Sequence, residues 1–429
     1  MEPKKFLFVS WDNLAGDLAW QLVKEGHQVK FGTIHQEDRD VSDGFVEKCD
    51  EWEKEADWAD VIIFDDVLGL GEKARKLKAQ GKFVVGGTPY TDKLEDDRAF
   101  GQDELKKAGV SILPYMEFTS FDDAIKYVRD NPGRYVIKPS GEAQNNKGLL
   151  FIGEEEDGAD VIQVLNDYQK AWAKKISVFQ LQKYVSGVEI AVGAFFNGKE
   201  FIYPINVNFE HKKLFPGNLG PSTGEMGTSM FWSNPNKLFN QTLKKMEPKL
   251  AEEGYVGYID VNTIVNGNGI YPLEWTSRFG YPTIQIQTEG MLSPVGEFFY
   301  ELAHGGTPKL RVKSGFQVGV RIVVPPFPFK DPETFKVKSK DSVIHFRKPT
   351  EGVHIEDTKI VNGEWVVTGH AGIIMVVCGC GPTMKSAREQ AYNRIKNIII
   401  PHMYYRDDIG ERWNEDSDKL HSWGYLRDS

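Results

Sequence analysis

Roughly the first 110 residues alternate short apolar strands with stretches of helical periodicity, and this alternation constrains the fold more than any other feature of the sequence. The apolar runs are KFLFVSW, HQVKFGTI, DWADVIIFDD and KFVVGG. Parallel strands need crossover connections, which are usually helices. The start of the chain is therefore predicted to form a parallel βαβ sheet with helices on its faces, followed by a helix from about Leu94 to Lys107.

From about residue 115 the pattern changes to strands joined by short turns. The segment RYVIKPSGEAQNNKGLLFIG combines a strand, a polar loop and a second strand, and Asn197-Gly198 is typical of a two-residue hairpin turn. A helix is expected at about 237–252, and GYIDVNTIVNGNGIYPLEW predicts a further hairpin. This mixture of helices and antiparallel strands indicates an α+β region.

A chain of 429 residues is long enough for about three domains. We expect an α/β domain, an α+β domain of two lobes, a β-rich domain that ends in an amphipathic helix, and a polar surface tail. The expected bounds are 1–114, 115–310 (with the smaller lobe at about 115–186), 311–412 and 413–429. Within the third domain, strands are expected near 317–324 and 343–347, with a hairpin at Asn362-Gly363.

Composition excludes several classes of function. The net charge of −10 disfavours nucleic acid as a partner, because a phosphate backbone needs clustered Lys and Arg. Apolar runs such as AGIIMVVCGCG fall short of the roughly 20 residues that span a bilayer, so no membrane partner is expected. The three cysteines, Cys49, Cys378 and Cys380, suggest buried thiols in a reducing cytoplasm. We expect a monomer or a small homo-oligomer that acts on small molecules.

Two lysines flank a polar loop. Lys138 ends an apolar strand, and the loop Gly141–Gly148 that follows contains Lys147. Backbone N–H groups of such a loop, with the two ammonium groups, could clamp a polyphosphate. The alternative is a solvated hairpin with two surface lysines. The spacing differs from G-x-x-x-x-G-K-[ST], so a Walker-type site is excluded.

Acidic side chains follow at three further positions. Glu189 begins a strand after a Ser-Gly turn and could accept hydrogen bonds from ribose, or could simply be exposed. Asp260 and Asn262 are two residues apart and therefore face one side of their strand. Glu274 on the partner strand could ligate Mg²⁺, which takes one or two carboxylates besides phosphate and water, and Arg278 could contact phosphate oxygens.

Along the chain, a strand that ends in a lysine is followed by a Gly-containing loop, by an acid that could bind ribose, and by an acid on a hairpin with an Arg after it. This order is similar to that of ATP-grasp enzymes. The sequence resembles the phosphoribosylamine–glycine ligase (glycinamide ribonucleotide synthetase) family in particular. EWTSRFGYPTIQ resembles the family's E-F-N-x-R-F-G-D-P-E-x-Q, and QKYVSGVE resembles its E-E-x-L-x-G-x-E. FEHKK, GPSTGEMGT, AREQAY and YRDDIG resemble further family segments, so the likeness runs from about residue 80 to 412.

The resemblance implies an ATP-grasp fold with an N-terminal pre-ATP-grasp domain and a small C-terminal β-rich domain. It also implies an enzyme that uses ATP and Mg²⁺ (or Mn²⁺) to join a carboxylate to an amine. In such enzymes the carboxylate attacks the γ-phosphate of ATP, and an amine then displaces phosphate from the acyl phosphate to form an amide. Positioning and charge neutralisation provide most of the catalysis.

Positions that match the family's motifs give the expected site residues. The nucleotide would contact Arg98, Lys138, Lys147, Gln182, Lys183, Tyr184, Val185 and Glu189. The metal would be held by Glu274, with Thr276 in place of a family Asn, and the strand pattern adds Asp260. Arg278, Lys147 and Glu274 would be catalytic. The substrates would contact His211, Lys212, Ser222, Thr223, Gly224, Glu225, Tyr281 and Thr283.

Departures from the family concentrate on the amine-acceptor side. Leu14, Ala15 and Gly16 stand where the family has Arg, Glu and His, and a leucine cannot replace an arginine that contacts a sugar phosphate. Further residues of this chain also differ from the family. Tyr281 and Thr283 replace two acids, Glu225 replaces a glycine, Thr276 replaces an Asn, and Asn145 and Asn146 replace small residues. The nucleotide side is largely kept, which suggests an altered acceptor.

Three hypotheses follow. The first is a carboxylate–amine ligase of this family with an altered amine acceptor and an amino acid as carboxylate. The second is a genuine phosphoribosylamine–glycine ligase of purine biosynthesis. The third is a lapsed enzyme that binds nucleotide without turnover, which the changed metal and acceptor positions motivate.

Overall fold

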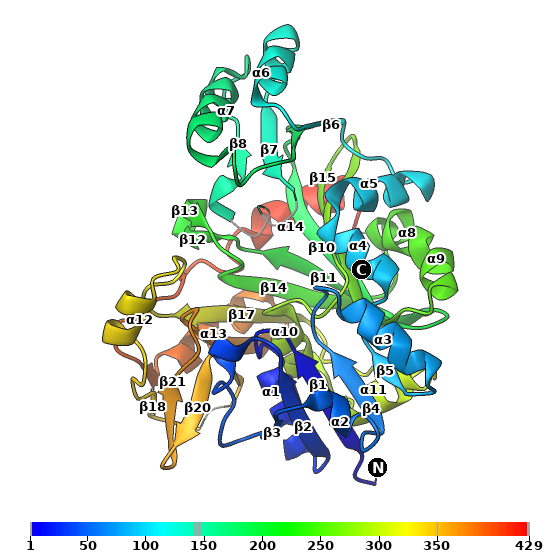
Figure 1. The fold of residues 1–429 in the computed structure, drawn as a ribbon, viewed down its shortest axis with the longest axis vertical. Helices are drawn as coiled ribbons and strands as arrows, with labels where there is room; N and C mark the ends of the chain where they lie inside the picture. The colour runs from blue at the N-terminus through cyan, green and yellow to red at the C-terminus, as the bar shows by residue number, and fades with distance from the viewer. Residues whose placement is uncertain (1, 141–142, 144–146, 350, 427–429) are drawn as a thin grey trace.

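Three larger β-sheets organise the chain, and the computed structural model describes them over residues 2–140, 143, 147–349 and 351–426. The N-terminal sheet lies at one end of the long axis and the four-stranded sheet at the other, with the eight-stranded sheet between them (Figure 1). No helix in the described residues is long and apolar enough to cross a membrane.

The N-terminal sheet is parallel, as the alternating pattern predicts. Its strand order is β3-β2-β1-β4-β5, with β1 paired in parallel to both β2 and β4. Its elements are β1 (Lys5–Ser10), α1 (Gly16–Lys24), β2 (Gln28–Thr33), η1 (Gln36–Asp38), β3 (Glu47–Cys49), α2 (Trp52–Glu55), β4 (Val61–Phe64), α3 (Leu70–Ala79) and β5 (Val84–Val85). Strand β4 is buried throughout, as expected for a strand covered on both faces.

The single helix expected from Leu94 to Lys107 is wrong in detail, because two helices meet at Asp97. They are α4 (Pro89–Asp96) and α5 (Arg98–Lys107). Asp97 has extended backbone angles, and its side chain accepts a hydrogen bond from the N–H of Phe100, which caps α5. The break places Arg98 at the first position of α5.

The four-stranded sheet is antiparallel, in the order β6-β9-β7-β8. Its elements are β6 (Tyr115–Phe118), α6 (Phe121–Asp130), β7 (Tyr135–Pro139), η3 (Lys147–Leu149), β8 (Phe151–Ile152), α7 (Ala159–Trp172) and β9 (Phe179–Lys183). Helices α6 and α7 lie together on one side of it (Figure 1). Asn145, Asn146 and most of the loop Gly141–Gly148 lie outside the described residues, as does the side chain of Lys147.

The eight-stranded sheet is antiparallel, in the order β16-β15-β10-β11-β14-β17-β22-β19. Its strands are β10 (Val188–Asn197), β11 (Phe201–Glu210), β14 (Gly227–Ser233), β15 (Val256–Asn266), β16 (Gly269–Thr276), β17 (Phe316–Val323), β19 (Val353–Ile355) and β22 (Ile373–Gly381). The predicted hairpin at Asn197-Gly198 joins β10 to β11, and the Asn197 side chain accepts from the N–H groups of Lys199 and Glu200. One sheet thus contains strands from both sides of residue 310.

The helix expected at 237–252 is also divided. It consists of α8 (Lys237–Gln241), η5 (Leu243–Met246) and α9 (Glu247–Glu252). Thr242 interrupts it with non-helical backbone angles. Its hydroxyl donates to the carbonyl of Leu238, a side-chain-to-backbone bond that competes with regular helix.

Helices α10 (Thr283–Gly290) and α11 (Val295–Ala303) join the N-terminal sheet to the large sheet through one apolar core. Phe6 and Phe8 of the first sheet, Phe195 of the second and Phe298 of α11 belong to this core. The large shared core fixes the N-terminal residues relative to β15 and β16, where the predicted acids lie.

The remaining elements lie outside the three larger sheets. They are β12 (Lys213–Phe215), η4 (Pro216–Asn218), β13 (Leu219–Ser222), α12 (Pro332–Lys338), β18 (His345–Phe346), β20 (Thr358–Val361), β21 (Glu364–Val367), α13 (Met384–Ile395), β23 (Ile398–Ile399) and α14 (Trp413–Ser422). The predicted hairpin at Asn362-Gly363 joins β20 to β21, and both turn residues have positive φ.

The segment after residue 412, expected as a polar surface tail, begins with helix α14. Trp413 packs edge-on against the rings of Phe209 and Phe231 of the large sheet. Leu420 and Tyr425 are buried in the same core. A few apolar residues spaced along a polar segment are enough to dock a helix, so the composition of the segment misled the prediction.

Candidate active site

A cavity of about 940 Å³ lies where the three sheets meet. Strands β7 and β9 form one wall, the exposed face of β10, β15 and β16 forms another, and the loops after β1 and β4 reach it from the N-terminal sheet. Of the predicted site residues, those on its wall are Arg98, Lys138, Gln182, Lys183, Tyr184, Val185, Glu189, Lys212, Ser222, Thr223, Gly224, Glu225, Asp260, Glu274, Thr276, Arg278, Tyr281 and Thr283.

Lys212 stands at the centre of three carboxylates. Its Nζ lies 2.9 Å from Oε1 of both Glu189 and Glu274, and 3.1 Å from Oε2 of Glu210. Burial opposes the charge of Glu189, yet the Lys212 ammonium outweighs it and holds the pKa of Glu189 below its usual value. Burial raises the pKa of Glu210, which its neighbour Glu189 raises further. Three acids therefore share one ammonium.

The hairpin of β15 and β16 places the predicted metal residues side by side. Asp260 pairs with Thr276, and Asn262 pairs with Glu274, so all four lie on one face. Burial, and then the charge of Glu210, raise the pKa of Asp260 well above its usual value. Its Oδ1 has no hydrogen-bond partner among the described residues. This face carries more negative charge than its protein neighbours neutralise.

Two cations lie at the opposite side of the same acids. Lys138 of β7 is 7% exposed, and burial, followed by the charge of Arg98, lowers its pKa to about 7. Arg98 begins α5 with Nη1 at 3.7 Å from Oε2 of Glu274, while its buried Nε has no hydrogen-bond partner among the described residues. A buried lysine beside an arginine fits an anion that neutralises both.

The segment Gln182–Val185 leaves β9 along the cavity wall. The N–H of Lys183 donates to the carbonyl of Pro114, and the N–H of Tyr184 donates to that of Arg134. The Arg134 guanidinium lies 3.8 Å from the centre of the Tyr184 ring. Backbone bonds and this cation–π contact therefore fix the segment before any ligand binds.

Arg278 is held by acids that the sequence analysis did not identify. Its Nε lies 3.2 Å from Oε1 of Glu95 and 3.4 Å from Oδ1 of Asp66, and its Nη1 donates to the carbonyl of Phe279. Glu95 also accepts a hydrogen bond from the N–H of Ser277, at 2.8 Å. Glu95 lies in α4, 183 residues before Arg278, so no local motif signals this contact.

The loop after β1 carries the residues that stand where the family has Arg, Glu and His. Leu14 lines the cavity, whereas Ala15 and Gly16 are buried. A Cβ on Gly16 would lie 2.1 Å from Oγ of Ser42, so a larger side chain does not fit there without movement. The Tyr281 hydroxyl donates to Oδ2 of Asp65 at 3.3 Å.

One predicted substrate residue is misplaced. His211 does not line the cavity: it is 2% exposed, and its Nε2 accepts from the N–H of Gly410 at 3.4 Å. Burial, together with the charges of Arg412 and Arg406, lowers its pKa to about 3, so the ring is neutral at pH 7. Side chains alternate along the β11 edge, and since Glu210 and Lys212 face the cavity, His211 faces away.

Glu225, in contrast, lines the cavity and is buried at the same time. Burial, and then the charge of Glu210, raise the pKa of Glu225 well above its usual value. Its backbone carbonyl accepts from Arg321, whose guanidinium also binds Glu356 at 2.8 Å. A side chain this buried is positioned to act as a neutral acid in the cavity wall.

Comparison with known proteins shows which proteins this chain resembles. Residues 96–284 match the model of the phosphoribosylglycinamide synthetase ATP-grasp (A) domain. The phosphoribosylamine–glycine ligase of Lactococcus lactis is 25% identical over 340 residues, covering 77% of this chain and 78% of that protein. The Listeria monocytogenes ligase is 24% identical over 372 residues, covering 84% of this chain and 86% of that protein.

Solved structures show the same fold. The phosphoribosylamine–glycine ligase of Thermotoga maritima superposes with a TM-score of 0.70 at 22% identity, covering 94% of this chain and all of that chain. Biotin carboxylase from Campylobacter jejuni gives a TM-score of 0.64 at 14% identity, covering 99% of this chain and 98% of that chain. The chain is therefore similar to the phosphoribosylamine–glycine ligases over most of its length, has the ATP-grasp fold, and matches the ATP-grasp (A) domain of that family over residues 96–284.

Proposed function

We propose that the protein uses ATP and Mg²⁺ to join a carboxylate to an amine acceptor that differs from phosphoribosylamine. The observation that carries this proposal is the charge distribution in the cavity. Lys138 and Arg98 face a cluster of acids around Lys212 at one end, whereas Leu14 and the acid-bound Arg278 lie at the other. The first end suits a polyphosphate with a cation, and the second lacks the grip that a sugar phosphate needs.

The residues present fit ATP. Lys138 has a pKa of about 7 because it is buried beside Arg98, and the buried Nε of Arg98 lacks a partner among the described residues. Phosphate oxygens would satisfy both groups. We assign the segment Gln182–Val185 to adenine and Glu189 to the ribose hydroxyls. Lys147 is assigned to the phosphates from its sequence position alone.

The residues also fit a divalent cation. Glu274 and Glu210 share one ammonium, and Oδ1 of the buried Asp260 has no partner among the described residues. We assign Glu274 and Asp260, with the hydroxyl of Thr276, to Mg²⁺. When bound, Mg²⁺ neutralises phosphate charge during transfer. Lys212 would then release Glu274 and remain with the other two acids.

The reaction that this arrangement supports has two steps. A carboxylate oxygen of the first substrate attacks the γ-phosphorus of ATP, and the bond from that phosphorus to the bridging oxygen breaks, giving an acyl phosphate and ADP. The amine nitrogen then attacks the acyl carbon, the carbon–oxygen bond to phosphate breaks, and the amine loses a proton. Arg98 and Lys138 would stabilise the charge of the transferring phosphate.

A second candidate is phosphoribosylamine–glycine ligation itself, the activity that the names of the relatives state. Lys330 favours it, because this exposed lysine lines the same cavity and could bind a phosphate. The loss of the family's cation at position 14 and the acid-bound state of Arg278 weigh against it.

The test is a screen for ADP and phosphate release with amino acids as carboxylates, against amines with and without a phosphate group. We expect amine-dependent ADP release with an acceptor that has no phosphate, and none with phosphoribosylamine plus glycine. Formation of glycinamide ribonucleotide would establish the second candidate instead. ATP binding without ADP release for any pair would indicate a lapsed enzyme.

A further inference from the structure

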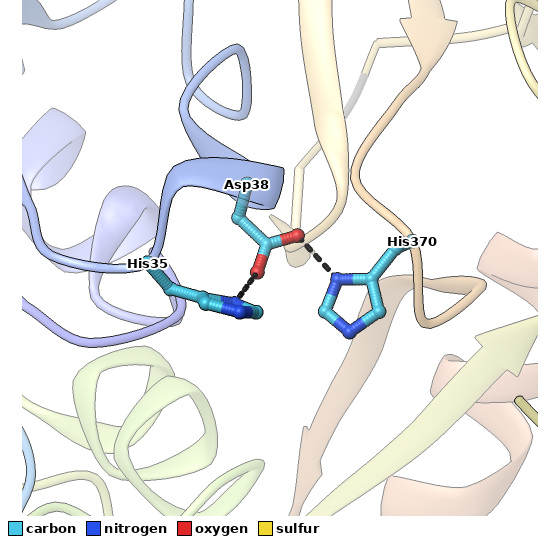
Figure 2. Close-up of side chains that lie close together, drawn as sticks. All are labelled: His35, Asp38 and His370. Carbon is cyan, nitrogen blue, oxygen red and sulfur yellow. Dashed lines mark hydrogen bonds and ion pairs between the residues drawn. The ribbon is translucent and has the colours of Figure 1, made fainter.

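A cluster of two histidines and an aspartate lies between the N-terminal sheet and the C-terminal half of the chain (Figure 2). His35 follows β2, Asp38 ends the short helix η1, and His370 lies in the loop between β21 and β22. Asp38 and His370 are 332 residues apart in sequence. The fold, and not a local motif, brings these three side chains together.

Both imidazoles turn the same nitrogen toward one carboxylate. Nδ1 of His35 lies 3.1 Å from Oδ2 of Asp38, and Nδ1 of His370 lies 2.7 Å from its Oδ1 (Figure 2). The ligand atoms of the three residues all lie within 4.8 Å of one another, and the ring centres are 5.6 Å apart. Small side-chain rotations would bring all three to the roughly 2.0–2.2 Å at which Zn²⁺ binds imidazole and carboxylate.

The negative charge around the two rings exceeds what neutral imidazoles balance. Asp38 is 2% exposed, and Oδ1 of Asp12 lies 3.1 Å from the same Nδ1 of His35. Asp357 is buried nearby, and burial, followed by the charge of Asp38, raises its pKa well above its usual value. The carboxylates of Asp38 and Asp12, which contact the two imidazoles, therefore favour a bound cation at this place.

The backbone that carries Asp38 is itself fixed. The side-chain amide of Asn13 donates to the Asp38 carbonyl. The Asn13 side-chain oxygen accepts in turn from the Thr33 hydroxyl at 2.8 Å and from Nζ of Lys48 at 3.1 Å. Such outer contacts orient metal ligands in proteins and limit their freedom before the ion binds.

One side of the cluster opens to the cavity. His35, His370 and Asp12 line the cavity wall, whereas Asp38 is buried behind them. Three protein ligands with one accessible position characterise catalytic zinc sites, while structural zinc sites are closed by four protein ligands. Imidazole nitrogen also distinguishes this cluster from the all-oxygen face of β15 and β16, since Mg²⁺ prefers oxygen ligands.

We propose that His35, Asp38 and His370 bind a divalent transition-metal ion of the Zn²⁺ type, with its open coordination position facing the cavity. Asp12 is positioned to bind this ion or a water on it. The site is separate from the Mg²⁺ site proposed on β15 and β16, and it does not depend on the ligase activity.

The experiment uses the full-length protein, stripped with a chelator and titrated with Zn²⁺ by calorimetry in excess Mg²⁺. We expect one Zn²⁺ per chain with a dissociation constant of about 1 μM or tighter, retained through dialysis as measured by elemental analysis. His370→Gln and Asp38→Asn should weaken binding by about 100-fold or more. His304→Gln, which alters an exposed histidine elsewhere, and Cys380→Ser, which removes a thiol, should bind as the unaltered protein does.

Thermal unfolding of each metal-free variant shows whether it folds. If the variants do not fold, the test uses Co²⁺ bound to the unaltered protein. Co²⁺ with His and carboxylate ligands has visible absorption bands, and it shifts the imidazole N–H proton resonances of the two histidines that bind it. Any of three results would overturn the proposal. They are unchanged Zn²⁺ binding in His370→Gln, displacement of Zn²⁺ by equimolar Mg²⁺, and a Co²⁺ form without shifted histidine resonances.

Discussion

The two ends of the cavity differ in how their charges are balanced. At the nucleotide end, Lys138, Arg98 and Lys212 stand among several acids, and the buried Nε of Arg98 has no partner in the described part of the chain. At the acceptor end, Arg278 is shared by Glu95 and Asp66. The first end can therefore bind an anion and a cation together. At the second end, two acids already neutralise the Arg278 guanidinium, so this end would accept an amine more readily than a phosphate.

Glu274→Ala gives the largest expected effect on the nucleotide end. We expect ADP formation to fall by roughly 1,000-fold, because the Glu274 carboxylate is assigned to Mg²⁺. The same carboxylate also contacts Lys212 and Arg98. Steady-state ADP release measures the loss, and circular dichroism should show an intact fold. Glu301→Ala, on the exposed side of α11, is the matched control. Unchanged turnover of Glu274→Ala would mean that the metal binds elsewhere.

Lys138→Met is expected to weaken ATP binding by roughly 10- to 100-fold, because one charged contact to the phosphates is lost. Isothermal calorimetry measures the dissociation constant. The fold should persist, since removing a buried cation also removes its desolvation cost. Lys199→Met, at an exposed turn, should leave binding unchanged.

Because the pKa of Lys138 is about 7, ATP binding is expected to change the protonation of this lysine, and the same measurement can detect the proton uptake. At pH 8 the free protein has lost most of that proton, and bound phosphate would restore it, so ATP binding should take up nearly one proton. At pH 6 the lysine is already protonated and contributes none. Calorimetry in buffers of different ionisation heat resolves the difference, and equal uptake in Lys138→Met would rule out Lys138 as the source.

The sequence indicated the two ends to different degrees, and the reason is chain distance. Glu189, Glu274 and Arg278 belong to local strand and hairpin patterns, so their common cavity follows from pairing β10, β15 and β16. Glu95 and Asp66 approach Arg278 from the N-terminal region, and no local pattern encodes that approach. The sequence therefore shows which family groups the acceptor end lacks, but not the acids that bind Arg278 there.

Glu210 and His211 show a different kind of error. Alternation along an extended strand puts residues 210 and 212 on one side and 211 on the other. The family motif spans FEHKK as a block and so indicates His211, whereas strand alternation indicates Glu210 together with Lys212. The breaks at Asp97 and Thr242 are harder to foresee, because each depends on one residue whose backbone leaves the helical region inside a helical pattern.

Lys212→Met tests whether the acids around it form the cation site. The three carboxylates are 14–35% exposed, so we expect a loss of about 1–3 kcal/mol in the free energy of unfolding, less than for fully buried partners. Millimolar Mg²⁺ should recover more stability in this variant than in the unaltered protein, since the ion replaces the missing ammonium. Denaturant unfolding with and without Mg²⁺ measures this, and an equal loss in both conditions would contradict the assignment.

Tyr281→Phe gives the smallest effect and probes the acceptor end. Burial, and then the charge of Asp66, raise the pKa of Asp65 to about 7, and the Tyr281 hydroxyl donates to its Oδ2. The folded protein therefore holds a proton on Asp65 that the unfolded chain releases near pH 4, so this group lowers the stability of the fold as pH rises from about 4 to 7. Above pH 7 the hydroxyl supports the carboxylate charge.

Removing the hydroxyl should thus cost little at pH 5 and about 1 kcal/mol at pH 8, with the pKa of Asp65 moved further upward. Denaturant unfolding at the two pH values gives the difference, and Tyr300→Phe controls for loss of a tyrosine hydroxyl elsewhere. ATP affinity should not change, because the Tyr281 hydroxyl is bound to Asp65, whereas Lys138 and Arg98 are the cations assigned to the phosphates. A pH-independent cost would show that Asp65 does not titrate in this range, and weaker ATP binding would show that the two ends are not separate.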